Sequence, residues 1–184
     1  MIGIPVLALA LFGALGVAVG GQVALQASFA RVRHPESLAT ANLTADAETV
    51  RGWYQQLAAQ GTLDQMIITE TVDYLWMAGL AASLVLVTFL AAALVRRRHS
   101  KAAARLHRLA PAMIAAPALD AVENALSLIM LSDPVGFPDP LAYAHAGVSM
   151  IKVVAAIGSA TVVPAYAVWA LIRGGTGTDS GNER

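Results

Sequence analysis

Two acids, an amide and a hydroxyl share one face of an otherwise apolar segment in the second half of the chain. These residues are Asp120, Glu123, Asn124 and Ser127. Their spacing of i, i+3, i+4 and i+7 is that of one helical face. An ionisable group inside a membrane segment is costly to bury and usually faces the interior of the bundle, beside a partner. The spacing therefore predicts a polar site inside the protein.

The last apolar segment carries a second polar face, because His145, Ser149 and Lys152 recur at i, i+4 and i+7. A short loop joins this segment to the preceding one, so the two helices should be antiparallel. Counted from that loop, Asp120 and Lys152 both lie about 16 Å deep, at about 1.5 Å per residue. We therefore expect Lys152 to pair with Asp120, with Glu123, or with both.

These polar groups allow three interpretations. In a pocket for a lipid or lipophilic small molecule, Asp120 or Glu123 would transfer a proton, with Lys152 as the charge partner. The ligand-binding residues would be Asp73, Tyr74, Asn124, Ser127, His145 and Ser149. In a structural lock, the same ion pairs would only order the helices. A proton or ion relay is the least favoured, because the inner half of the second segment offers only Ser83 and Thr88 as polar groups.

Four apolar segments must position these side chains. The 184 residues are 57% hydrophobic and 13% charged, with a mean hydropathy of +0.62, whereas a soluble domain carries about 25% charge. At about 20 residues per crossing, the predicted spans are residues 2–25, 72–95, 109–131 and 141–172. The sequence thus predicts an all-α integral membrane four-helix bundle. We expect one membrane domain over residues 1–174 and a flexible tail over 175–184.

Composition also excludes several classes of function. The 12 basic and 12 acidic residues balance, which argues against a nucleic-acid partner. There is no cysteine, so disulfides, Cys-ligated metals and iron–sulfur clusters are excluded. The histidines are separated by the expected topology, and no metal site is predicted; they are His34, His99, His107 and His145. The sequence leaves the identity of any other cofactor open.

Loop charge predicts the orientation in the membrane. The loop at 96–108 holds six Lys and Arg residues, whereas the loop at 132–140 holds none. Basic loops remain in the cytoplasm. We therefore expect a multi-pass protein of the cytoplasmic membrane with both termini inside, and the polar stretch between the first two spans outside.

An amphipathic helix is predicted in that outer stretch, over about residues 45–60. Its apolar face would be formed by Val50, Trp53, Tyr54 and Leu57. Thr44 can cap its beginning and Gly61 can end it. The aromatic residues favour the headgroup level of a bilayer, so this helix should lie on the outer interface or cover the bundle.

A different class of function is a structural or accessory subunit of a membrane complex, or a homo-oligomer. Gly16 and Gly20 have the small-xxx-small spacing that permits close helix contact. No soluble-enzyme signature is present, so the sequence leaves open whether any reaction is catalysed.

Three features together resemble a family of bacterial four-helix membrane proteins of unassigned function. They are the amphipathic helix before the second span, the Asp73-Tyr74 pair that opens that span, and the Asp-x-x-Glu-Asn motif at 120–124. The resemblance covers most of the chain and implies the four-span fold, but no activity. The plan is also similar to that of sterol-isomerase-like enzymes, by architecture alone, and to that of quinone-linked reductases, whose cysteine pairs are absent here.

Overall fold

The described part of the chain folds into helices joined by short loops and contains no strand. The computed structural model describes residues 3–97 and 99–173. The elements are α1 (Ile4–Val32), α2 (Leu38–Leu43), α3 (Ala47–Ala59), α4 (Leu63–Val95), α5 (Ser100–Leu109), the 3-10 helix η1 (Ala110–Ile114), α6 (Ala115–Ser132) and α7 (Asp139–Arg173). The predicted all-α class is confirmed. The tail predicted at 175–184 lies outside the described residues.

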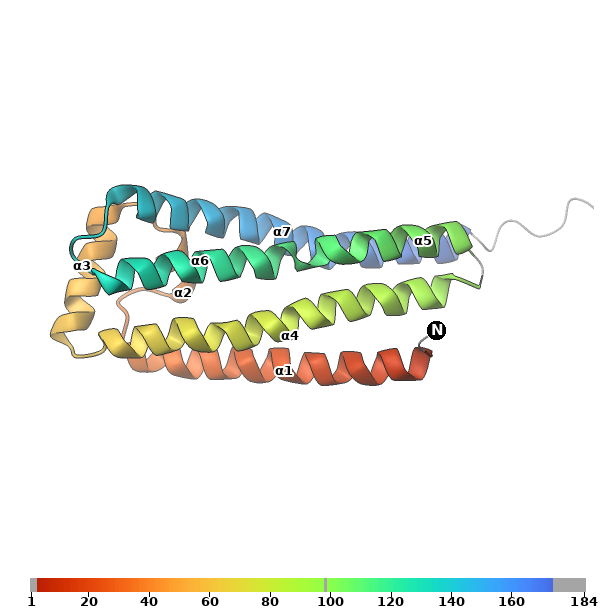
Figure 1. Ribbon diagram of the computed structural model, residues 1–184, viewed down its shortest axis with the longest axis horizontal. Helices are drawn as coiled ribbons and strands as arrows, with labels where there is room; N and C mark the ends of the chain where they lie inside the picture. The colour runs from red at the N-terminus through yellow and green to blue at the C-terminus, as the bar shows by residue number, and fades with distance from the viewer. Residues whose placement is uncertain (1–2, 98, 174–184) are drawn as a thin grey trace, which may run out of the picture.

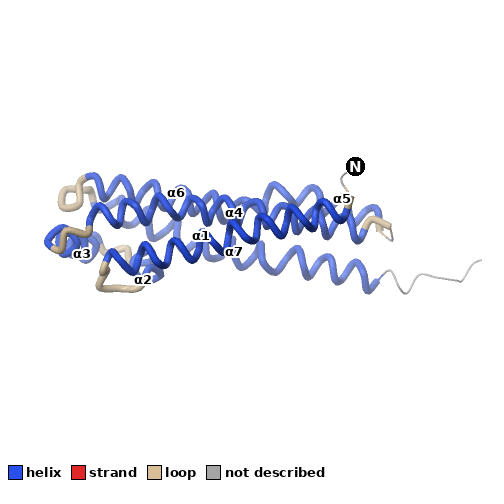
Figure 2. The backbone as a smooth tube through the Cα atoms, turned by 90° about the horizontal axis from the view of Figure 1, so that it is seen from below, coloured by secondary structure: helices blue, strands red, loops and turns tan. Residues whose placement is uncertain are grey.

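Among residues 3–97 and 99–173, four stretches are long and apolar enough to cross a membrane. They are α1, α4, the run from α5 through α6 (Ser100–Ser132), and α7 up to Ile172. They lie side by side as an elongated bundle, in which α1 packs along α4 and α6 packs along α7 (Figure 1). Helices α2 and α3 lie at one end, which we call the α3 end. The beginning of α1 and helix α5 lie at the opposite end, which we call the α5 end (Figure 2).

The spans are longer than hydropathy alone predicts, because polar side chains at the α3 end are paired inside the bundle. Helix α4 begins at Leu63 rather than near residue 72, and α1 continues to Val32. The hydroxyls of Ser28 and Thr69 lie 2.8 Å apart, and Gln65 Nε2 donates to Ser28 Oγ at 2.9 Å. A hydrogen bond removes much of the cost of burying such groups, so both helices extend past the purely apolar sequence.

Two glycines set the close approach of α1 and α4. A Cβ on Gly79 would lie 2.7 Å from Ala18 Cα, and one on Gly21 would lie 2.7 Å from the Trp76 backbone nitrogen. By contrast, a Cβ on Gly16 or Gly20 would meet nothing within 4 Å. The close contact predicted for Gly16 and Gly20 is therefore not made within the described chain. Contact of these two residues with a partner stays a prediction.

Helix α3 lies within the range predicted for a helix, but another residue caps it. The Asp46 side chain accepts a hydrogen bond from the Thr49 backbone N–H at 3.0 Å. Thr44, the expected cap, instead ends α2, because that short helix occupies the residues before it. Gly61 has φ of 68°, a left-handed conformation that favours glycine after a helix.

Helix α3 is held against the loop between α6 and α7 and against the first residue of α7. Arg51 forms an ion pair with Asp139, and its Nη2 donates to the Phe137 carbonyl at 2.8 Å. The same guanidinium lies 4.9 Å from the Phe137 ring centre, and the Tyr54 ring meets Phe137 edge-on at 6.0 Å. These contacts hold α3 across the end of the bundle (Figure 1).

His34 connects the end of α1 to α3. Its ring centre lies 5.6 Å from that of Phe29 and 5.1 Å from that of Trp53. Burial lowers the pKa of His34 from its ordinary value, against the opposing influence of a hydrogen bond and the charge of Glu36. The folded segment therefore binds a proton less readily than the unfolded one.

This difference predicts that the packing of α2 and α3 loosens in acid. Stability contributed by neutral His34 is complete above the unfolded pKa of about 6.5 and is lost as the pH falls below it, by at most about 1.4 kcal/mol per pH unit. Amide exchange of residues 38–59, corrected for its intrinsic pH dependence, should show lower protection at about pH 5.5 than at pH 7.5. His34→Gln should remove the change, and the same pH dependence in that variant would contradict this role.

Candidate functional site

Four buried carboxyl groups from two helices meet in the half of the bundle nearer the α3 end. We call them the acid cluster, and they are Glu70, Asp73, Asp120 and Glu123. Their exposed fractions are 6%, 8%, 6% and 0%. Helix α4 supplies the first two and α6 the last two. Buried acids require partners, and those partners define the site.

Lys152 of α7 pairs with both acids of α6. Its Nζ lies 2.8 Å from Asp120 Oδ1 and 2.7 Å from Glu123 Oε2. The pairing expected from the depth count is therefore present. The lysine side chain is 19% exposed, so little water screens these contacts.

Helix α6 is joined to α4 through its amide and hydroxyl. Asn124 Nδ2 donates to Asp73 Oδ2 at 3.0 Å and to the Glu70 carbonyl oxygen at 3.2 Å. Ser127 Oγ donates to Glu70 Oε1 at 2.6 Å. These two predicted ligand-binding residues thus connect helices, and they orient the two acids of α4.

Glu70 belongs to the site although it precedes the predicted second span. The predicted span began at residue 72, so Glu70 counted as part of the outer polar stretch. A signal was nevertheless present, because Glu70, Asp73 and Met77 are spaced i, i+3 and i+7, one helical face, and all three are buried. Extending that face backwards from Asp73 would have found Glu70.

The remaining predicted ligand-binding residues differ in burial and in the groups that they contact. Ser149 and His145 are buried, and Ser149 Oγ donates to the His145 carbonyl at 3.0 Å. His145 lines a small cavity with Glu70. Tyr74 is 40% exposed, and its hydroxyl donates to the Ala121 carbonyl at 3.3 Å. Tyr74 therefore lies at the edge of α4 and α6, outside the acid cluster.

Acids outnumber bases in this site. If all four acids and Lys152 were ionised, their charges of −4 and +1 would sum to −3. Within the described residues, Asp73 Oδ1 and Glu123 Oε1 are buried without a hydrogen-bond partner. Glu123 Oε2 meets Lys152 at 2.7 Å but lacks hydrogen-bond geometry. Such oxygens can accept a hydrogen bond, a proton or a cation.

A cavity of about 10 Å³ adjoins the acid cluster on the side of α3. Tyr54, Glu70, Ser127 and His145 contribute to its wall. This is the space of about one water molecule. Burial raises the pKa of the Tyr54 phenol, which keeps the phenol protonated and able to donate. Among the described residues, no three His, Asp or Glu side chains converge closely enough to hold a metal ion.

Within the described residues, four helices have the length and apolar composition of a multi-pass membrane protein, and the buried acid cluster lies among α4, α6 and α7. Comparison of the chain with protein families, curated proteins and solved structures found no match. The function must therefore be inferred from the site itself.

Proposed function

We propose that the protein binds the polar end of a lipid or lipophilic small molecule at the acid cluster and exchanges a proton with it. The observation that supports this proposal is the excess of buried carboxyl groups, with Asp73 Oδ1 and Glu123 Oε1 unpaired in the described chain. A purely structural network would be expected to satisfy its buried acceptors. If the site only ordered the helices, its unsatisfied acceptors would lower the stability of the protein and would serve no function.

The chemistry of the acid cluster selects the ligand class. Carboxylates accept hydrogen bonds and attract positive charge, so the ligand should present a hydroxyl or an amine at its polar end. Asp120 and Glu123 are the proton-transfer groups of this proposal, with Lys152 as their charge partner. Lys152 already binds one oxygen of each acid, which leaves the second oxygen of Glu123 to receive or release the proton.

Access to the acid cluster requires movement in this proposal. The adjoining cavity of about 10 Å³ has room for a water molecule but is far smaller than the roughly 300–1,000 Å³ of a small-molecule pocket. The ligand would enter where α2 and α3 cover the α3 end. With the basic loop in the cytoplasm, this end would face the extracytoplasmic side.

A second candidate function is that of a structural or accessory subunit. The closed packing around Lys152 favours it, because one lysine joins α6 and α7 through two acids. In that case the acid cluster would hold no ligand, and the exposed side of α1 with Gly16 and Gly20 would meet a partner protein or a second copy. The two candidates differ in what copurifies with the chain.

Native mass spectrometry of the full chain released from mild detergent should separate these candidates. We expect an adduct of one defined mass on the wild-type protein, and an occupancy lowered roughly tenfold in Asp73→Asn, which loses a charged hydrogen-bond acceptor worth about 1.5–3 kcal/mol. Asp73→Asn keeps an oxygen for Asn124 and leaves the Lys152 ion pairs intact.

Asp64→Asn is the matched control, because it neutralises an exposed acid of the same helix. Its adduct should equal that of the wild type. A bare wild-type mass, or an adduct unchanged in Asp73→Asn, would reject ligand binding at the acid cluster and favour the structural subunit. Measuring the oligomer mass in the same spectrum would show whether copies associate.

A further inference from the structure

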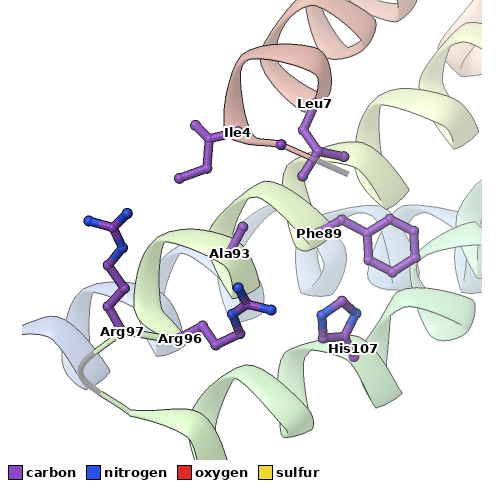
Figure 3. Close-up of a pocket in the computed structure, with 8 residues that line it drawn as sticks. Ile4, Leu7, Phe89, Ala93, Arg96, Arg97 and His107 are labelled. Atoms are coloured by element: carbon purple, nitrogen blue, oxygen red, sulfur yellow. The ribbon is translucent and has the colours of Figure 1, made fainter. Parts of the chain in front are cut away.

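A second cavity lies at the α5 end, far from the acid cluster. It has a volume of about 500 Å³, is open on one side, and is lined by the beginning of α1, the end of α4 and helix α5 (Figure 3). The lining residues are Gly3, Ile4, Leu7, Phe89, Ala93, Arg96, Arg97 and His107. The volume lies within the roughly 300–1,000 Å³ of small-molecule sites.

The wall of this cavity has an apolar part and a basic part. Ile4 and Leu7 of α1 lie opposite Ala93 and Phe89 of α4, while Arg96 and Arg97 extend from the end of α4 (Figure 3). The His107 ring completes the wall from α5, with its centre 5.3 Å from that of Phe89. A molecule that fills this space must therefore be apolar over part of its length and polar at the end.

Charge selects an anion for the polar end. The sequence contains no Asp or Glu between residues 1 and 35, between 74 and 119, or between 140 and 178. The parts of α1, α4 and α5 that form the cavity therefore contribute positive charge alone. Helix α1 also begins here at Ile4, without a side-chain cap, so the positive end of its dipole adds to the attraction.

We propose that this cavity binds an anionic phospholipid, with the phosphate beside Arg96, Arg97 and His107 and an acyl chain along Leu7 and Phe89. Long basic side chains at the ends of membrane helices reach the headgroup level, and basic pockets between such helices suit anionic headgroups. The apolar wall selects a lipid over free phosphate, because phosphate alone would leave the exposed Ile4 and the partly exposed Phe89 in contact with water. The inference does not depend on the proposed function of the acid cluster.

The test compares two double variants of the full chain that lose the same charge at the same end. Arg96→Gln/Arg97→Gln removes two cations of the cavity. Lys101→Gln/Arg108→Gln removes two exposed cations that do not line it. Each protein is incubated in mild detergent with equal amounts of phosphatidylglycerol and phosphatidylcholine of matched acyl chains, and bound lipid is measured by native mass spectrometry.

We expect wild-type protein and the Lys101→Gln/Arg108→Gln control to retain phosphatidylglycerol in preference to phosphatidylcholine. Arg96→Gln/Arg97→Gln should lower phosphatidylglycerol occupancy roughly tenfold below that control, as expected for lost charged hydrogen bonds. Ala93→Phe, which fills the cavity and keeps its charge, should lower occupancy as well. Circular dichroism verifies folding, and the arginine comparison decides alone if Ala93→Phe does not fold.

Three results would overturn the proposal. An equal loss in the two double variants would mean that the lipid follows general surface charge. A wild-type protein without preference for phosphatidylglycerol would mean that the cavity does not select an anion. Displacement of the lipid by inorganic phosphate at a similar concentration would show that the cavity binds the phosphate group and that the acyl chain contributes nothing.

Discussion

Replacing Lys152 with methionine should lower the free energy of unfolding by about 3–5 kcal/mol, the usual result of removing one partner from a buried ion pair. Lys152 Nζ lies 2.8 Å from Asp120 and 2.7 Å from Glu123, so one substitution leaves two buried acids without their cation. Methionine keeps much of the volume and flexibility of the lysine stem, and the expected loss is therefore electrostatic.

Reversible unfolding in mild detergent, followed by circular dichroism with added denaturant, measures this loss. Lys101→Met is the matched control, because that lysine is exposed and its replacement should change stability by less than about 0.5 kcal/mol. Equal stability of Lys152→Met and Lys101→Met would mean that the two ion pairs contribute little to the fold.

A neutral triple variant, Lys152→Met with Asp120→Asn and Glu123→Gln, should recover part of the lost stability. Uncharged groups of similar volume can replace a buried ion pair with little loss. The triple variant also separates the two candidate functions. Recovered stability with loss of the defined adduct would assign the charges to ligand binding, whereas recovered stability without any adduct in the wild type would assign them to the fold.

Hydropathy and helical spacing predicted the arrangement that the membrane itself imposes. A bilayer requires about 20 apolar residues per helix, so the four spans could be read from composition. The short loop between α6 and α7 fixes their relative depth, and the rise of about 1.5 Å per residue then places Lys152 beside Asp120 and Glu123. The four spans and the pairing of Lys152 were therefore both predicted by counting residues along the sequence.

Contacts between segments that are distant in the sequence could not be predicted in this way. Glu70 is buried because Ser127, on another helix, donates a hydrogen bond to it at 2.6 Å. Hydropathy is averaged over residues that are adjacent in the sequence, so it cannot include a partner on another helix. Likewise, the basic loop was evident, but the apolar half of the α5-end cavity comes from Ile4 and Leu7 of α1. Its existence depends on how α1 packs along α4.

That packing depends on glycine, and Gly79→Ala should destabilise the protein by about 2 kcal/mol net. The new Cβ would lie 2.7 Å from Ala18 Cα, and backbone cannot yield as a flexible side chain can, so α1 and α4 must separate. Overpacking typically costs about 1–3 kcal/mol, occasionally more. This loss should exceed the roughly 1 kcal/mol by which alanine favours a helix over glycine.

Gly16→Ala is the control for this experiment, because its Cβ would meet nothing within 4 Å. It should be neutral or slightly stabilising, and equal unfolding curves for the two variants would show that Gly79 does not set the helix distance. Displacing α1 also moves Leu7, which belongs to the α5-end cavity, whereas the acid cluster is built on α4 and α6. Gly79→Ala should therefore reduce anionic lipid occupancy more than it reduces the adduct at the acid cluster. The difference arises because α1 lines the α5-end cavity but supplies no residue to the acid cluster.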